Sequence, residues 1–246
     1  MRVLLSLSIC VSVCLAQESK PDKLPKIIVA SPLAITAGVP VHVALRGLFL
    51  DEISEVKIAG VETKIEIASK GKATVPQNYD AKRIGDTQAE IKLTLPAETP
   101  PGALQLIAIS AAGTSVPYPI TVAKREDLID EKEPNDGFKT AQPITVGKTV
   151  VGTIHDPRNV DVFEIKGQAG QKLVITVLAS QAGSPLDPFL TLYDSTGQVI
   201  AGNDDTDGRD PRLEAVLSKA GSYYISLQDA NDSGGPHFAY LLKIAP

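Results

Sequence analysis

The chain has 246 residues, of which 43% are hydrophobic and 4% aromatic, and its formal net charge is −5. This length and hydrophobic content suit two cores of ordinary domain size. The acidic balance creates no positive field, which excludes nucleic-acid binding as a function class. The 19 glycines and 18 prolines, with no tryptophan, favour short strands joined by turns over helices.

Residues 1–16 have the pattern of a secretory signal peptide. A basic residue at the start is followed by an apolar run over residues 3–13 and by a small-x-small cleavage site that ends at Ala16. The run is shorter than the roughly 20 residues that a membrane span needs. Because Cys10 and Cys14 both lie in this segment, we expect a secreted or periplasmic chain without disulfides or reactive thiols.

Residues 24–124 alternate apolar and polar side chains at short intervals. Val41, Val43 and Leu45 share one face of residues 40–45, for example. This period is typical of half-buried antiparallel strands, and about seven short strands in about 100 residues indicate an immunoglobulin-like sandwich. Strands are predicted at residues 26–30, 40–45, 55–58, 61–68, 89–95, 103–110 and 118–122.

Turn motifs punctuate the strands of this half at Ser31-Pro32, Gly38-Val39-Pro40, Arg46-Gly47-Leu48-Phe49 and Pro100-Pro101-Gly102. These motifs resemble those of the immunoglobulin-like TIG class. The resemblance implies a spacer or interaction module beside another domain. Residues 73–85 interrupt the strands with a polar stretch, which predicts a surface loop, either solvated or used for recognition.

An acidic linker is predicted at residues 125–136, between the two halves. Glu131, Glu133, Asn135 and Asp136 place four oxygen-bearing side chains within six residues. Calcium is a hard cation that prefers such oxygen ligands. The stretch therefore predicts part of a calcium site, with a plain solvated linker as the alternative.

Residues 131–246 predict a second sandwich, so the expected fold class is all-β. Eight short strands over about 115 residues indicate a jelly-roll-like arrangement. They are predicted at residues 150–154, 161–165, 172–179, 188–193, 198–201, 213–217, 222–227 and 238–244.

A series of short motifs runs through this half: Glu131-Lys132-Glu133-Pro134-Asn135-Asp136, Gly152-Thr153-Ile154, Asp161-Val162-Phe163, Leu190-Thr191-Leu192-Tyr193-Asp194 and Ala220-Gly221-Ser222-Tyr223-Tyr224. These motifs resemble the bacterial pre-peptidase C-terminal domain family, and are similar to the collagen-binding domains of clostridial collagenases. The family resemblance implies a β-sandwich of secreted proteins, with calcium held between the preceding linker and the strand that carries Asp-x-Phe.

The resemblance also implies a set of calcium ligands. Side-chain oxygens would come from the four linker residues named above and from the Asp161 carboxylate, and a backbone carbonyl from Thr153. Asn159 stands where a further oxygen ligand fits. Since calcium takes about six to eight oxygens, ligands from two segments would join the linker to the sandwich.

A second acidic cluster follows the calcium-loop spacing D-x-[DN]-x-[DN]-G-x5-E, with asparagine at the first position. Asn203, Asp205, Asp207 and Glu214 would be its ligands. Strand-like flanks and Pro211 argue against an EF-hand. The alternatives are a calcium-binding β-loop and a polar hairpin turn.

The sequence contains little that indicates catalysis, and no enzyme activity is predicted. It has three histidines and no nucleophile elbow, HExxH motif or phosphate loop. Alternation places Tyr224 on the solvent side of its strand, as a candidate ligand surface. We expect a secreted, calcium-stabilised module that binds an extracellular protein or polysaccharide; an accessory region of a secreted protease system and a cryptic hydrolase are the alternatives.

Overall fold

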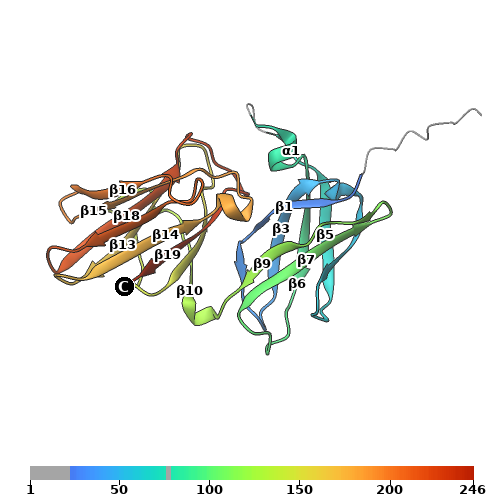
Figure 1. Cartoon of the computed structure of the whole chain (residues 1–246), viewed down its shortest axis with the longest axis horizontal. Coiled ribbons are helices and arrows are strands. Elements are labelled where there is room, and N and C mark those ends of the chain that lie inside the picture. Colours follow the sequence, from blue (N-terminus) through green and yellow to red (C-terminus); the bar gives the residue numbers. More distant parts are fainter. Residues whose placement is uncertain (1–22, 76–78) are drawn as a thin grey trace, which may run out of the picture.

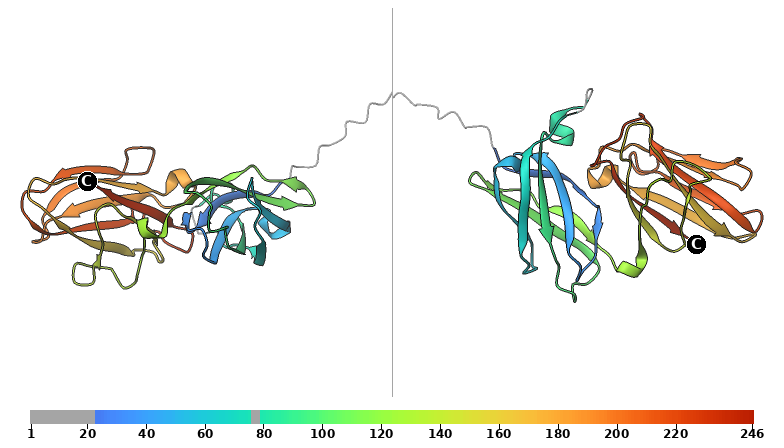
Figure 2. Two further views of the ribbon diagram at one scale, coloured as in Figure 1. Left: turned by 90° about the horizontal axis from the view of Figure 1, so that it is seen from below. Right: turned by 180° about the vertical axis from the view of Figure 1, so that it is seen from behind.

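The computed structural model describes residues 23–75 and 79–246, and strands dominate both halves (Figure 1). The all-β fold class is confirmed. The predicted signal peptide, with both cysteines, lies outside the described residues. Within the described part, no helix is long and apolar enough to cross a bilayer. Two β-sandwiches lie side by side along the longest axis (Figures 1 and 2).

The first sandwich encloses a core of aliphatic side chains between two sheets. One sheet has the order β1 (Lys26–Ser31), β3 (Val41–Leu48), β6 (Thr87–Leu93) and β5 (Ile65–Lys72). The other has the order β2 (Ala34–Ile35), β9 (Tyr118–Val122), β7 (Gly102–Ser110) and β4 (Ile53–Ile58), with β8 (Gly113–Thr114) paired to β7. Two short helices, η1 (Leu50–Glu52) and α1 (Ala81–Ile84), lie between strands.

The sequence pattern placed strand β5 too early. Residues 61–68 were the expected strand, whereas β5 spans Ile65–Lys72. Strands β4 and β5 belong to different sheets, so the chain must cross between them. It does so through a turn at Gly60, where φ is +74° and Val61 bridges back to Ile58.

The second sandwich has two five-stranded sheets. The first has the order β10 (Leu128–Asp130), β12 (Thr149–Thr153), β19 (Ala239–Ala245), β14 (Lys172–Leu178) and β17 (Arg212–Val216). The second has the order β11 (Gln142–Pro143), β13 (Val160–Gly167), β18 (Gly221–Asp229), β15 (Pro188–Tyr193) and β16 (Val199–Asn203). Short 3-10 turns, η2 (Arg125–Asp127) and η3 (Ser180–Ala182), precede β10 and follow β14.

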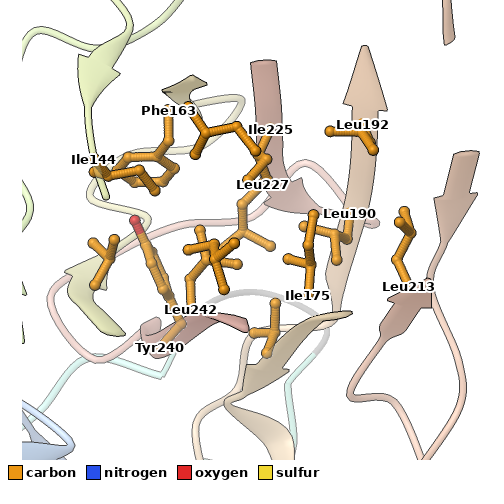
Figure 3. Close-up of a cluster of buried hydrophobic side chains, with 14 of the residues drawn as sticks. Ile144, Phe163, Ile175, Leu190, Leu192, Leu213, Ile225, Leu227, Tyr240 and Leu242 are labelled. Carbon is orange, nitrogen blue, oxygen red and sulfur yellow. The ribbon is translucent and has the colours of Figure 1, made fainter. Parts of the chain in front are cut away.

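The core of the second sandwich is filled by alternate side chains from both sheets (Figure 3). Phe163, Tyr223, Phe238 and Tyr240 are all buried in it, so four of the aromatic side chains serve packing. Tyr240 is fully buried and carries its hydroxyl with it, and a buried phenol needs a hydrogen-bond partner. That partner belongs to the site described below.

The two sandwiches are packed against each other. Val29 and Leu33 of the first half join Ala239 and Leu241 of the second in one buried apolar cluster. The Tyr118 hydroxyl crosses the junction and donates to the carbonyl of Ala182 at 2.7 Å. The two halves therefore share a fixed interface.

Candidate metal centre

The acidic linker is held by the backbone against both sheets of the second sandwich. Strand β10 runs parallel to β12, and the N–H of Glu131 continues this pairing by donating to the Val151 carbonyl at 3.0 Å. Four residues further on, the Asn135 carbonyl accepts from the N–H of Val162 on β13 at 2.9 Å. Residues 131–135 therefore bridge the two sheets at their edge.

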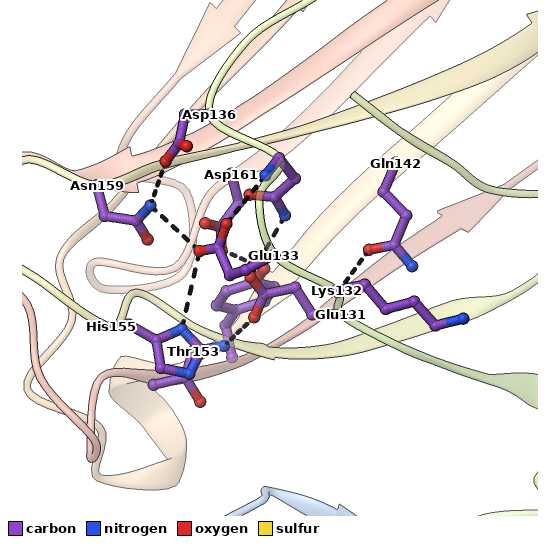
Figure 4. A network of polar contacts seen from close by, with 11 residues as sticks. Glu131, Lys132, Glu133, Asp136, Gln142, Thr153, His155, Asn159 and Asp161 are labelled. Carbon is purple, nitrogen blue, oxygen red and sulfur yellow. Dashed lines mark hydrogen bonds and ion pairs between the residues drawn. The ribbon is translucent and has the colours of Figure 1, made fainter. Parts of the chain in front are cut away.

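Glu131 lies inside this bridge, next to a glycine that makes room for it. Its Oε2 accepts from the N–H of Thr153 at 2.8 Å (Figure 4). A Cβ at Gly152 would lie 2.8 Å from that oxygen and 2.3 Å from the ring of Tyr240. Only glycine allows the carboxylate and the phenol to approach the strand so closely.

Asp161, the aspartate of Asp-x-Phe, faces the linker from β13 and is fully buried. Its Oδ2 accepts from the Tyr240 hydroxyl at 2.5 Å. Three buried side-chain oxygens at this place accept no hydrogen bond from any described residue: Oδ1 of Asp161, of Asn135 and of Asn159. Buried oxygens are expensive to leave without a partner, and three together fit a cation that takes oxygen ligands.

The electrostatics of the protein groups alone are unfavourable. Burial, and then the negative charge of Glu131, raise the pKa of Asp161 to about 8. Burial also raises the pKa of Glu131. Both effects disfavour the ionised carboxylates, and a divalent cation between them would reverse this.

The structure brings together most of the predicted ligands (Figure 4). Glu133 lies in the same cluster, and its Oε2 accepts from the N–H of Asn135 at 2.9 Å. The side-chain amide of Asn159 links Glu133 to Asp136. Its Nδ2 donates to the Glu133 carboxylate at 3.4 Å and to the Asp136 carboxylate at 3.0 Å. Thr153 contacts the site through its N–H, as described above.

Two residues of the site were missed by the sequence reasoning. Nδ1 of His155 lies 3.9 Å from Glu133 Oε1, and His155, Glu131 and Glu133 offer ligand atoms that lie within 4.8 Å of one another. For His155, the sequence offered one signal: it lies two residues after Thr153, which is a predicted ligand. Tyr240 gave no signal, because only the folded structure places its hydroxyl on Asp161.

In metal-free buffer, the stability of the protein is expected to fall as the pH rises through 8. Asp161 is protonated more easily in the folded state, with a pKa of about 8, than in the unfolded state, where an aspartate has a pKa of about 4. Folding is therefore favoured while Asp161 holds its proton, and this stabilisation is lost when the carboxyl group ionises. The free energy of unfolding should fall by about 1.4 kcal/mol between about pH 7 and 9. Chemical denaturation at both pH values measures this, and Asp161→Asn should abolish it.

A decrease below about pH 6.5 would have a different origin. His237 is buried, and burial lowers its pKa to about 4. As the pH falls from about 6.5 to about 4, the unfolded state takes up a proton at this residue that the folded state does not, so stability falls in this range, outside the window used for Asp161.

The second predicted metal loop connects β16 and β17, which belong to different sheets, through a turn closed by the bridge between Asp207 and Asp210. Oδ1 of Asn203 accepts from Thr206 Oγ1 at 2.8 Å, and Glu214 forms an ion pair with Arg212. Asp205 and Asp207 are exposed, and Gly208 has φ +64° in the turn. Asp210 is buried instead, where it accepts from three N–H groups of residues 179–181.

Tyr224 is half-buried beneath an aromatic residue that follows the linker. Its ring stacks on Phe138 with the centroids 4.6 Å apart, and Phe138 also meets the edge of Tyr193 at 5.2 Å. Phe138 is 40% exposed and covers the other two rings. The surface therefore presents a three-ring cluster, which we call the aromatic patch.

Comparisons with known proteins agree with the family resemblance predicted for the second sandwich. Residues 159–229 match the family described as bacterial pre-peptidase C-terminal domain. This match includes Asn159 and Asp161 and begins after the linker ligands. The matched domain is a non-catalytic module fold.

The chain is also similar to a probable subtilase-type serine protease of Deinococcus radiodurans. The two are 36% identical over 136 residues, which are 53% of this chain and 19% of that protein. The chain thus spans about a fifth of the length of this relative.

Among solved structures, the pre-peptidase C-terminal domain of a Bacillus anthracis collagenase is similar at 17% identity and a TM-score of 0.37, covering 46% of this chain and 99% of that one. The secreted serine protease VesC of Vibrio cholerae is similar at 10% identity and a TM-score of 0.32, covering 86% of this chain and 48% of that one. The comparisons do not confirm the TIG-type resemblance of the first half, which stays a prediction.

Proposed function

We propose that this chain is a calcium-stabilised, non-catalytic binding module that works outside the cytoplasm. The observation that carries the proposal is the meeting of three unpartnered, buried oxygens of Asn135, Asn159 and Asp161 with the carboxylates of Glu131 and Glu133. The donors are almost all oxygen, which fits calcium better than a thiophilic metal.

Bound calcium would supply the positive charge that the buried carboxylates lack. The residues of the linker and of β13 would then share one ion, so that residues 131–136 are fixed to the sandwich. The role is architectural: it sets the path of the chain between the two halves and the position of Phe138, which follows directly.

Isothermal titration calorimetry of the chelator-treated protein tests the ion. One calcium per chain is expected, with a dissociation constant of about 10 µM or lower and much weaker binding of magnesium, which requires stricter octahedral geometry. No heat and no retained calcium in equilibrium dialysis would contradict the proposal.

The aromatic patch is the proposed contact surface for an extracellular protein or polysaccharide. Exposed aromatic rings provide large contact areas at low entropic cost. Pull-down on insoluble polysaccharides and on gelatin measures it. Tyr224→Ala should weaken retention about tenfold or more, whereas Val216→Ala, which alters a 60% exposed residue on the opposite sheet, should not. Equal loss in both variants would argue against the patch.

A role beside a secreted protease is the second candidate. The similarity to a subtilase-type protease favours it. Copurification with a protease from the native culture medium would support this role, and purification of the chain alone would argue against it.

A further inference from the structure

A cavity of about 450 Å³ opens at the junction of the two sandwiches. Its volume lies within the range of about 300–1,000 Å³ that is usual for small-molecule sites. Both halves supply its walls, so that neither forms it alone. Its lining includes Arg46, Lys72 and Gln88 from the first half, and Pro236, His237 and Phe238 from the second.

The walls are held in place by contacts across the junction. Tyr79 of the first half meets the ring of Phe238 of the second edge-on, with the ring centroids 6.2 Å apart. Gly183 approaches the carbonyl of Ile28 so closely that a Cβ would lie 1.9 Å from it. Together with the Tyr118 hydrogen bond, these contacts make the cavity preformed.

Arg46 brings a buried positive charge to this cavity. The residue is 9% exposed, and its Nε and Nη2 donate to the backbone carbonyls of Thr74, Ile84 and Gly85. Within residues 23–75 and 79–246, no carboxylate lies close enough to form an ion pair with it, and the nearby charge of Asp86 offsets only part of the burial that lowers its pKa. Neutral carbonyls satisfy N–H groups but not the charge, and a buried charge is stable only when it is compensated.

His237 places a second unusual group in the wall. It is 5% exposed, and its Nδ1 has no hydrogen-bond partner among the described residues. Burial, and then the nearby charge of Arg46, lower its pKa to about 4, so the ring is neutral near pH 7. A neutral imidazole pairs with hydroxyl groups and adds no second charge.

We propose that this cavity binds a small hydroxylated organic acid, of the size of a sugar acid, with its carboxylate toward Arg46 and Lys72. The hydroxyl groups would pair with the polar wall of Gln88 and His237. The carbon skeleton would lie against Phe238 and Pro236. Guanidinium and carboxylate form strong charge-assisted hydrogen bonds, and a single anionic group of this kind would give Arg46 a direct ion-pair partner.

NMR titration of the full chain tests the site, with glucuronate as the probe and glucose and inorganic phosphate as comparisons. Glucuronate should shift the ring signals of His237 and the Nε–H of Arg46 in a saturable way, and glucose should bind about tenfold more weakly because it lacks the carboxylate. Equal binding of glucose, preference for phosphate over glucuronate, or no shifts at about 10 mM glucuronate would each overturn the proposal.

Two variants separate the charge from the fold. Lys72→Gln removes an exposed cation at the cavity, which also pairs with Asp51 at 2.8 Å, and should weaken glucuronate binding about threefold. Lys64→Gln, the matched control just before the same strand, should leave binding unchanged. Arg46→Gln should abolish binding, with an unchanged amide spectrum elsewhere as the folding check. If Lys72→Gln and Lys64→Gln behave alike, or if a folded Arg46→Gln protein still binds glucuronate, the assignment is wrong.

Discussion

The melting temperature in excess calcium is expected to exceed that in chelator by about 5–10 °C. A ligand present at a hundred times its dissociation constant adds about 2.7 kcal/mol to the free energy of unfolding, provided that it binds only the folded state. For a chain of this size, each kcal/mol corresponds to about 2–4 °C. The unfolded linker cannot assemble the site, because Asp161 lies on β13 and Glu131 in the linker after β10, and the two meet only after folding. Scanning calorimetry with and without chelator measures the difference.

The matched control for this experiment is Asp205→Ala. It removes one exposed carboxylate from the second acidic cluster, so the calcium response should persist. Glu133→Ala should remove most of it. The opposite pattern would move the ion to the loop between β16 and β17, and an unchanged melting temperature in the unaltered protein would remove the calcium proposal altogether.

The fold was predictable where a strand was long enough to show its period. Strand β6 alternates buried and exposed residues along its whole length, and its position was predicted to within two residues. The two-residue strands β2, β8 and β11 have no period to detect. Strand β10 was concealed in a run of charged residues, because its pairing with β12, and not its own composition, makes it a strand.

The candidate site was predictable in part for a similar reason. Glu131, Glu133 and Asn135 are neighbours in sequence, and the Asp-x-Phe motif marked Asp161, so a family resemblance could join them. Tyr240 lies far along the chain, and nothing in its surroundings suggests an acidic partner. The same limit hid the cavity at the junction, since Arg46 and His237 come from different halves.

Asp161→Asn is expected to abolish the calcium response and yet to raise stability in chelator. Asparagine keeps the shape of the side chain and an oxygen that can accept from Tyr240, but it removes a buried carboxyl group whose pKa is raised to about 8 by burial and by Glu131. In chelator at about pH 8, the free energy of unfolding of the variant should therefore exceed that of the unaltered protein by about 2–4 kcal/mol. Calcium should close this gap, because only the unaltered protein gains binding energy.

Asp161→Ala is the contrasting variant: it leaves the buried Tyr240 hydroxyl without an acceptor and should lower stability in both conditions. Urea titrations in calcium and in chelator measure the free energy of unfolding of all three proteins. An asparagine variant that is less stable than the unaltered protein in chelator, or that responds fully to calcium, would show that Asp161 is a packing residue and not a ligand.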